Sequence, residues 1–213
     1  MPPKALVDSD YLQRGVRHFR TEIFPKKREL YEKLAEKQVP HALFITCGDS
    51  RIDPEALTNS APGEIFVERT PGNIVPVYNQ TAAVGVSASI EYSIVVLGVK
   101  DVVVCGHSAC GAMKGLLYPE KLETIPATAR WLKYASPVLA RLHRDFAQLK
   151  GHSQLKRLSQ LNVIEQMAHL HTHPAVEERV QKGKLRLHGW YYEIHTGIVE
   201  VFNPRTSAFE EWL

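Results

Sequence analysis

The chain has 213 residues, of which 44% are apolar and 23% charged, and its formal net charge is +3 at pH 7. This composition is ordinary for a globular protein, and the charge is too small and too scattered to indicate nucleic-acid binding. Three cysteines exclude a complete disulfide framework. No apolar run is long enough to span a membrane, and the N-terminus lacks the apolar segment of a signal peptide. We therefore expect a cytoplasmic protein with reduced thiols and no membrane or nucleic-acid partner.

The N-terminal segment predicts two helices within residues 8–38. Asp8 and Ser9 can cap the first helix, and Pro25 ends it and suits the first turn of the second. The second helix is highly charged and has few strongly apolar residues. Such an arm often packs against something outside its own domain, but a plain surface helix fits the pattern at least as well.

Two apolar, β-branched runs predict strands that end just before reactive side chains. The first, residues 42–46, runs to Cys47, and another, residues 101–105, leads to His107. Between these strands, the sequence predicts a helix that starts at Asp53-Pro54, a short strand at 64–67, a loop at 70–73 with unusual backbone angles at Gly72, and a mostly apolar helix at 81–97 that Gly98 ends. After the second strand, it predicts a helix that begins near Ser108 or Ala109 and further helices within 126–149, within 162–171 and after Pro174. The end of the chain, 185–202, is strand-like, with turns at Gly189 and Gly197.

Strands that alternate with helices indicate an α/β fold. We expect a mainly parallel central sheet flanked by helices, within one domain over residues 1–213. Residues 1–38 would form an N-terminal helical arm and residues 39–213 the core. The helix at 81–97 is apolar on most sides, which predicts burial on more than one face, part of it at a subunit interface.

Cys47, His107 and Cys110 each follow a predicted strand end. Because the carboxyl ends of parallel strands border one crevice, we expect these side chains to lie together there. Thiolates and imidazoles are the usual ligands of Zn²⁺, and three protein ligands leave one position open, as in catalytic zinc sites. A helix that begins near Ser108 or Ala109 would place Cys110 in its first turn, where the helix dipole stabilises a thiolate.

Asp49 and Arg51 lie two residues apart in the loop that follows Cys47. A guanidinium keeps a neighbouring carboxyl group ionised and can hold it through two hydrogen bonds. Asp49 would then either occupy the fourth position on the metal and close the site, or be held away by Arg51 and accept a hydrogen bond from metal-bound water. Without the metal ligands, the two residues would be an ordinary surface pair in a turn.

Other potential ligands have simpler interpretations. Cys105 lies inside the predicted strand at 101–105 and is expected to be a buried core residue. His169, His171 and His173 are spread around a predicted helix end, which favours a solvated cluster over a metal site.

The motifs at the two strand ends resemble those of the β-class carbonic anhydrases. Cys47–Arg51 (CGDSR) and His107–Gly111 (HSACG) stand in the order and spacing of that family. The resemblance covers roughly residues 38–200. It includes Pro62-Gly63, Phe66, Arg69, Gly72–Pro76, Ser89–Tyr92, Gly111–Gly115, Asn162-Val163 and Leu187–Trp190.

This resemblance implies an enzyme, a zinc lyase that reversibly hydrates carbon dioxide to bicarbonate and a proton. It implies Zn²⁺ on Cys47, His107 and Cys110. It also implies that Asp49 and Arg51 are the catalytic pair, in which Asp49 orients an attacking zinc-bound hydroxide.

The substrate pocket of the family is apolar and lies at a dimer interface, so the resemblance implies a homodimer or a larger homo-oligomer. Gln38 is implied as a donor to bicarbonate, and Phe66 and Tyr92 as walls of the pocket. In the family, some of these residues come from the neighbouring subunit. Gly111 would offer its backbone N–H near the substrate.

Two departures from the family pattern lead to further expectations. Phe44 replaces a Trp that some members use in a regulatory bicarbonate site, so we expect no such site here. The presence of Gln38 points in the same way to a permanently open metal site. Thr70-Pro71 replaces the commoner Asn and a small or apolar residue, so Pro71 is expected to reshape one wall of the pocket and to affect turnover.

Two other functions stay open at the level of sequence. An enzyme that hydrolyses carbon disulfide or a related heterocumulene would have the same zinc site and a different access to the pocket. A non-catalytic binding protein or bicarbonate sensor would have a closed, structural zinc. Asp49 and Arg51 argue against the second alternative, because a structural site needs no hydroxide acceptor.

Overall fold

The computed structural model describes residues 10–79 and 84–212. The chain divides into two compact units, Met1–Gln38 and Val39–Leu213. The single-domain organisation over residues 1–213 stays a prediction. The expected cap residues Asp8 and Ser9, and the expected helix start at residue 81, lie outside the described residues.

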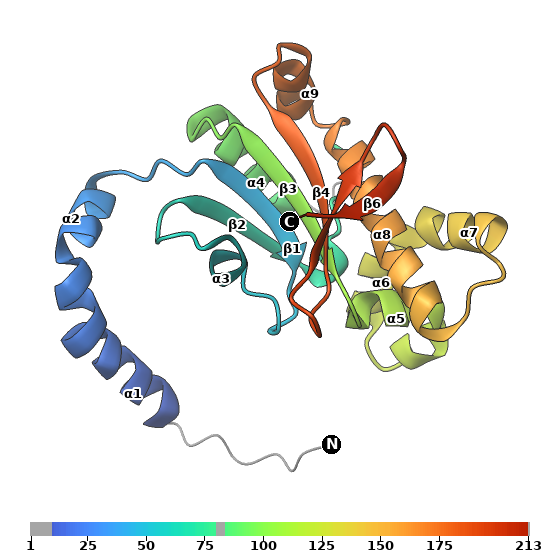
Figure 1. Cartoon of the computed structure of the whole chain (residues 1–213), viewed down its shortest axis with the longest axis horizontal. Coiled ribbons are helices and arrows are strands. Elements are labelled where there is room, and N and C mark those ends of the chain that lie inside the picture. Colours follow the sequence, from blue (N-terminus) through green and yellow to red (C-terminus); the bar gives the residue numbers. More distant parts are fainter. Residues whose placement is uncertain (1–9, 80–83, 213) are drawn as a thin grey trace. The chain divides into compact units, whose positions relative to one another are not determined.

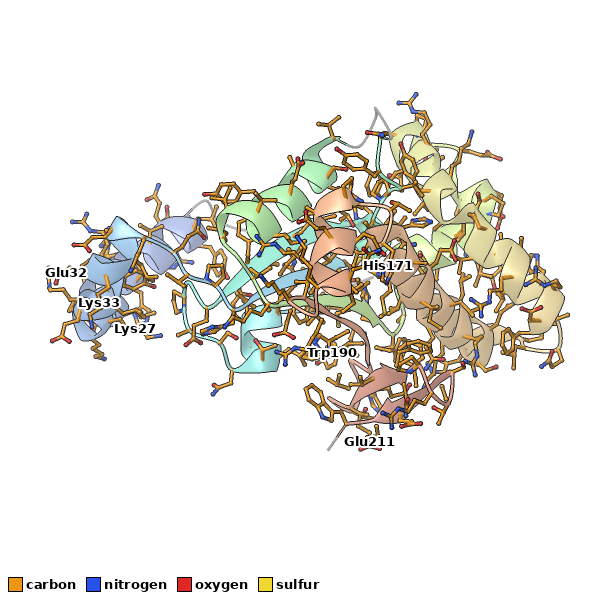
Figure 2. The ribbon with its side chains drawn as sticks, turned by 90° about the horizontal axis from the view of Figure 1, so that it is seen from above. Lys27, Glu32, Lys33, His171, Trp190 and Glu211 are labelled. Atoms are coloured by element: carbon orange, nitrogen blue, oxygen red, sulfur yellow. The ribbon has the colours of Figure 1, made fainter. Side chains whose placement is uncertain are left out.

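The described part of the first unit is helical from residue 10 to residue 36, and the helix type changes around Pro25 (Figure 1). Its elements are α1 (Asp10–His18), a π turn (Phe19–Ile23), a 3₁₀ turn (Phe24–Lys27) and α2 (Arg28–Glu36). Pro25 lies in the 3₁₀ turn because it has no N–H to donate to a continuous α-helix. The second α-helix therefore starts at Arg28 rather than at Pro25. Lys27, Glu32 and Lys33 lie along this charged segment (Figure 2).

The second unit contains a six-stranded sheet, counted over the described residues, in the order β2-β1-β3-β4-β5-β6. The strands are β1 (Ala42–Cys47), β2 (Ile65–Thr70), β3 (Asp101–His107), β4 (Arg186–Tyr192), β5 (Val199–Asn203) and β6 (Ala208–Glu211). The first four are parallel, and β5 and β6 extend one edge in the antiparallel sense. The predicted mainly parallel α/β sheet is therefore confirmed.

Helices cover this sheet, and some of their bounds differ from the predicted ones (Figure 1). They are α3 (Pro54–Thr58), α4 (Val84–Glu91), α5 (Gly111–Leu117), α6 (Pro126–Leu132), α7 (Ser136–Asp145), α8 (Gly151–Leu170) and α9 (Pro174–Gln181). A π segment, Tyr92–Val96, continues α4 until Gly98 ends it at a φ of +71°. The stretch at 126–149 is split because Pro137 cannot extend α6 and instead starts α7.

α8 packs closely against β3 and β4 because glycines face it. A Cβ on Gly106 would lie 2.8 Å from Val163 Cγ2, and one on Gly189 would lie 2.6 Å from the Met167 sulfur. The prediction of a turn at Gly189 is therefore wrong: this glycine lies within β4 and admits the helix. Gly197, at a φ of +78°, does lie in the β4–β5 connection.

The sheet order places a topological switch point between β1 and β3. The chain leaves β1 for β2 on one side and later returns to β3 on the other side of β1. The two crossovers then diverge, which opens a crevice at the carboxyl ends of β1 and β3. Cys47 and His107 are the last residues of these two strands.

Candidate metal centre

Three potential metal ligands meet at the switch point. The side-chain donor atoms of Cys47, His107 and Cys110 all lie within 4.8 Å of one another, and all three residues are buried. Within residues 10–79 and 84–212, no other group of three His, Cys, Asp or Glu side chains gathers in this way. The two sulfurs are 3.9 Å apart and both thiols are free, far from the roughly 2.05 Å of a disulfide.

A sharp turn between β3 and α5 brings Cys110 back toward Cys47. Ala109 adopts a φ of +54°, and Ser108 anchors the turn by donating its N–H to the Tyr192 carbonyl over 2.9 Å. Cys110 keeps a non-helical conformation and caps α5, whose first residue is Gly111. The expectation that Cys110 lies inside the first helical turn is therefore wrong by one residue. The left-handed turn at Ala109 delays the start of the helix.

The donor set fits Zn²⁺. His107 Nδ1 donates to the Ser108 carbonyl over 2.9 Å, which leaves Nε2 buried and without a hydrogen-bond partner. A buried nitrogen without a partner is costly, unless it binds something. A tetrahedral zinc with two bonds to sulfur of about 2.3 Å holds the sulfurs about 3.8 Å apart. The observed 3.9 Å between Cys47 and Cys110 matches that separation.

The two thiols share their protons unequally. The pKa of Cys47 is lowered to about 4, first by a hydrogen bond from Cys110 and also by His107 and the Gly72 N–H, although burial opposes the shift. The pKa of Cys110 is raised well above its usual value, because its S–H donates a hydrogen bond to the Cys47 sulfur and burial disfavours a second charge. A bound cation would favour ionisation of both thiols, so metal binding would release a proton.

Arg51 donates three hydrogen bonds to the Asp49 carboxylate. The Arg51 backbone N–H and Nε donate to Oδ1 at 3.0 and 2.9 Å, and Nη2 donates to Oδ2 at 2.6 Å. This guanidinium keeps the pKa of Asp49 well below its usual range. Nη2 also donates to the Ala109 carbonyl over 3.2 Å, and Asp49 Oδ2 lies 3.9 Å from His107 Nε2. The carboxylate thus lies beside the three ligands while its oxygens are directed to Arg51.

Comparisons with known proteins agree with this geometry. A model of the carbonic anhydrase family matches residues 42–199. A carbonic anhydrase of Pseudomonas aeruginosa is 43% identical over 195 residues, which cover 92% of this chain and 88% of that protein. The solved β-carbonic anhydrase CcaA superposes with a TM-score of 0.92 at 37% identity, over 95% of this chain and 98% of that one. The chain belongs to the β-carbonic anhydrases.

Membership in this family makes the chain an enzyme of the lyase class. A tetrameric β-carbonic anhydrase of Sordaria macrospora also superposes, with a TM-score of 0.82 at 27% identity, over 91% of this chain and 95% of that one. None of the helices in the described part of the chain is long and apolar enough to cross a membrane.

The expected pocket residues of this β-carbonic anhydrase do not all gather at the three ligands of their own chain. Gly111 directly follows Cys110, with open space where a side chain would start. Phe66 is the sheet partner of Leu43. Leu43 lies four residues before Cys47, so about 13 Å of strand separates this pair from the Cys47 ligand. Tyr92 packs against Phe66, with ring centroids 6.2 Å apart. Gln38 is the last residue of the first unit.

The Thr70-Pro71 departure from the β-carbonic anhydrase pattern lies next to the metal centre. Thr70 is the sheet partner of Cys47, and its hydroxyl donates to the Ile74 carbonyl over 3.0 Å. Pro71 is exposed, and its carbonyl accepts a hydrogen bond of 2.8 Å from Trp131 Nε1. An effect of Pro71 on turnover stays a prediction. Phe44 is buried with its ring edge-on to Trp190, and the absence of a regulatory site there also stays a prediction.

The three histidines near the end of α8 are not a solvated cluster, contrary to the sequence-based expectation. His173 is buried and donates from Nε2 to the Pro76 carbonyl over 3.0 Å, and His169 Nδ1 lies 2.6 Å from the Val75 carbonyl. His171 alone of the three is well exposed, and its Nδ1 lies 2.6 Å from Glu177 Oε2 (Figure 2). The helix pattern could not show that a distant loop, which carries Val75 and Pro76, covers this end.

The expectation for Cys105 is confirmed. It is fully buried in the core, and burial raises the pKa of its thiol.

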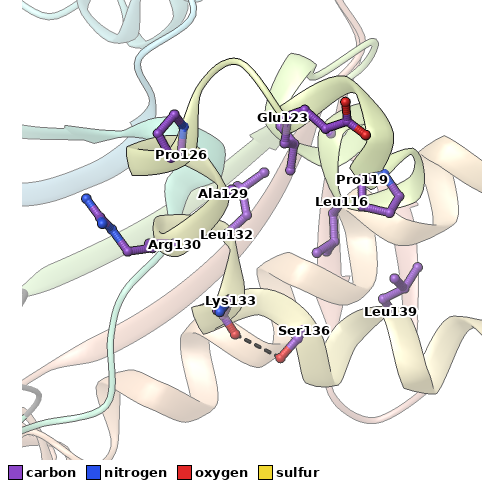
Figure 3. Close-up of a pocket in the computed structure, with 12 residues that line it drawn as sticks. Leu116, Pro119, Glu123, Pro126, Ala129, Arg130, Leu132, Lys133, Ser136 and Leu139 are labelled. Atoms are coloured by element: carbon purple, nitrogen blue, oxygen red, sulfur yellow. Dashed lines mark hydrogen bonds between the residues drawn. The ribbon is translucent and has the colours of Figure 1, made fainter.

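An apolar cavity of about 530 Å³ lies elsewhere, between α5, α6 and α7 (Figure 3). Leu116, Leu132 and Leu139 contribute to its lining, with Glu123, Arg130 and Lys133 at its margin. None of the three potential zinc ligands lines it, so it is separate from the metal centre.

Sequence reasoning missed the contacts that support the ligands. It predicted unusual backbone angles at Gly72, and the φ of +76° confirms them. It did not foresee that the Gly72 N–H donates to Cys47 Sγ over 3.3 Å. Asn162 and Gln166, buried on α8, hold the same loop. Two amides four residues apart on an otherwise apolar helix face were the available sign.

Proposed function

We propose that the chain catalyses the reversible hydration of carbon dioxide at a Zn²⁺ held by Cys47, His107 and Cys110. The observation that supports this most strongly is the buried, unpartnered Nε2 of His107 beside two free sulfurs 3.9 Å apart. When bound, Zn²⁺ supplies the Lewis acidity that makes water a nucleophile near neutral pH. The family membership supplies the reaction type.

In this proposal Asp49 orients the attacking water. Its carboxylate is ionised throughout the neutral range because Arg51 holds the pKa low. An ionised carboxylate only accepts hydrogen bonds, so Asp49 fixes the direction of an O–H group in the crevice. The lone pair of that water oxygen then faces the carbon of carbon dioxide.

Arg51 keeps the site open in this proposal. Three hydrogen bonds from Arg51 would have to break before Asp49 could rotate onto the metal. Two of them form a charge-assisted pair with the guanidinium, which is stronger than neutral hydrogen bonds. The geometry therefore favours the open alternative over a fourth protein ligand from Asp49.

We further propose a homodimer or larger homo-oligomer with the active site at a subunit interface. Tyr92, Val95 and Val96 are 44%, 56% and 64% exposed on one helical segment. Apolar side chains gathered in this way indicate a protein contact. A second copy on this segment would bring Phe66 and Tyr92 to a neighbouring metal centre, which their own chain leaves without them. Gln38 is proposed as a further residue of that pocket. The Gly111 N–H would complete the pocket from the same chain.

The three free cysteines fit a reducing compartment, so we also propose a cytoplasmic location.

Stopped-flow hydration of carbon dioxide by zinc-loaded protein, from mildly acidic to alkaline pH, tests the proposed function. We expect activity at neutral pH. Activity that appears only at alkaline pH would mean that Asp49 closes the site. No hydration at any pH, with zinc bound, would overturn the proposal, and hydrolysis of carbon disulfide by the same sample would then identify the alternative enzyme.

A further inference from the structure

Two buried amides on α8 connect the helix to the loop beneath the metal centre. The Val75 N–H donates to Gln166 Oε1 over 2.8 Å. Gln166 Nε2 donates to Asn162 Oδ1 over 2.9 Å, and Asn162 Nδ2 donates to the Gly72 carbonyl over 2.8 Å. Neither amide side chain is exposed to solvent. The three hydrogen bonds form one continuous chain from Val75 to Gly72.

The direction of this chain is fixed at both ends by the backbone. A peptide N–H can only donate, so Gln166 must present its oxygen to Val75. A peptide carbonyl can only accept, so Asn162 must present its NH₂ group to Gly72. Rotating either amide by half a turn would place two donors or two acceptors together in the protein interior, which is costly. The loop therefore has one preferred position relative to α8.

Gly72 transmits this position to the metal centre. Its carbonyl accepts from Asn162, and its N–H donates to Cys47 Sγ over 3.3 Å. A Cβ at Gly72 would lie 3.0 Å from Met113 Cε and 3.1 Å from Ala112 Cβ, so only glycine fits there without a shift. The peptide groups on both sides of Gly72 are therefore held between α8 and the Cys47 sulfur.

We propose that Asn162 and Gln166 are positioning residues that, through the Gly72 N–H, weaken the electron donation of Cys47 to the metal. This inference rests on the proposed zinc centre. A hydrogen bond to a thiolate withdraws electron density from sulfur, and such outer contacts tune metal sites. Two thiolates would otherwise offset the charge of Zn²⁺ and reduce its Lewis acidity. The Gly72 N–H counteracts part of that effect.

Asn162→Asp is the decisive variant, measured with Co²⁺ in place of Zn²⁺. An ionised Asp has nearly the same shape but cannot donate to the Gly72 carbonyl, so it repels the loop. We expect the sulfur-to-cobalt charge-transfer band to move to lower energy, because the Cys47 sulfur becomes a stronger donor. We also expect hydration by the zinc form at neutral pH to fall roughly 10–100-fold, with its pH midpoint shifted upward.

Gln166→Leu is the second variant, and Gln160→Ala is the matched control. Gln166→Leu breaks the chain one step further from Gly72, so its band should shift in the same direction by less. Gln160 is also a buried amide on α8, but it donates to Glu200 Oε2 over 2.7 Å, away from the loop. Gln160→Ala should lower the melting temperature without moving the band.

The outcomes separate this inference from the proposed function. If the sulfur-to-cobalt band has the same energy in Asn162→Asp and in Gln166→Leu as in the wild-type protein, the positioning role is overturned and the metal centre stands. A wild-type protein that binds Co²⁺ without any sulfur-to-cobalt band would overturn the metal centre itself, and the inference with it.

Discussion

The two ends of the parallel strands differ in how their polar groups are satisfied. At the amino end of β3, Asp101 accepts hydrogen bonds of 2.7 Å from Nε and Nη2 of Arg186 and 2.8 Å from His188 Nε2. At the carboxyl end, His107 Nε2 has no partner. Paired groups at one end contribute to stability alone. The buried His107 nitrogen at the other end is left available to a ligand, which in the proposed function is the metal.

The largest effect expected from this difference is at the carboxyl end. Cys47→Ser replaces a thiolate with a poor zinc ligand. We expect zinc affinity to fall by more than about 100-fold, and hydration to fall with it. Substitution of a residue that only contacts a metal ligand already lowers metal affinity by about 10–100-fold, so loss of a ligand itself should cost more. Zinc content after dialysis measures the loss. Cys105→Ser is the control, because this buried thiol lies outside the ligand group, and zinc loss in the control as well would contradict the assignment.

Asp49 should separate catalysis from metal binding. Asp49→Asn keeps the shape of the side chain but adds donors in place of the charge. We expect hydration to fall by about 10²–10³-fold, the range for losing one oriented hydrogen-bonding group in an active site, with zinc content unchanged. Stopped-flow rates and zinc content on the same samples give both values. An active Asn variant would show that the Asp49–Arg51 pair is only structural.

His173 sharpens the comparison because it is buried and its Nε2 has a hydrogen-bond partner, the Pro76 carbonyl. Burial lowers its pKa below 6.5, aided by nearby His169, while the Pro76 carbonyl and Glu91 oppose the shift. A histidine with a lowered folded pKa contributes stability above its unfolded pKa, and that contribution is lost as the pH falls. We expect the melting temperature to fall below a pH of about 6.5 and His173→Gln to weaken this dependence. An equal pH dependence in both proteins would contradict the prediction.

The smallest effect is expected at Asp101. Arg186 first, and then His188, lower the pKa of Asp101. The stabilisation is therefore present at neutral pH and is lost as acid protonates the carboxylate below its usual pKa of about 3.9. Asp101→Asn should cost about 0.5–1 kcal/mol in the free energy of unfolding, as expected for a largely exposed pair, with unchanged hydration. Denaturant titration would show the difference at neutral pH and its disappearance in strong acid.

The sequence was most informative where chemistry and strand pattern coincide. Cys47 and His107 could be placed together because each follows an apolar run, and parallel strands deliver both to one edge. The predicted start of α5 was wrong, and Cys110 lies one residue before the helix. A left-handed φ of +54° is usually found at glycine, and here it occurs at Ala109, so the sequence did not indicate the turn. The start of α8 at Gly151 preceded the predicted one, because its first turns are polar.

Long-range contacts account for the other differences. The burial of His173 and the partial burial of His169 depend on a loop almost a hundred positions earlier in the chain, which no local pattern encodes. The turn predicted at Gly189 was wrong because the glycine serves helix packing rather than a change of direction. Phe66 and Tyr92 were expected to line the pocket, yet their own chain keeps them near Leu43, so their role depends on a second copy.

A crystal structure of the zinc-loaded protein at slightly alkaline pH, with anomalous scattering to locate the metal, tests the central claim most directly. We expect one zinc bound by Cys47 Sγ, His107 Nε2 and Cys110 Sγ, with Asp49 still on Arg51 and the fourth position free of protein. A zinc bound by four protein ligands, or located away from these three side chains, would contradict the account.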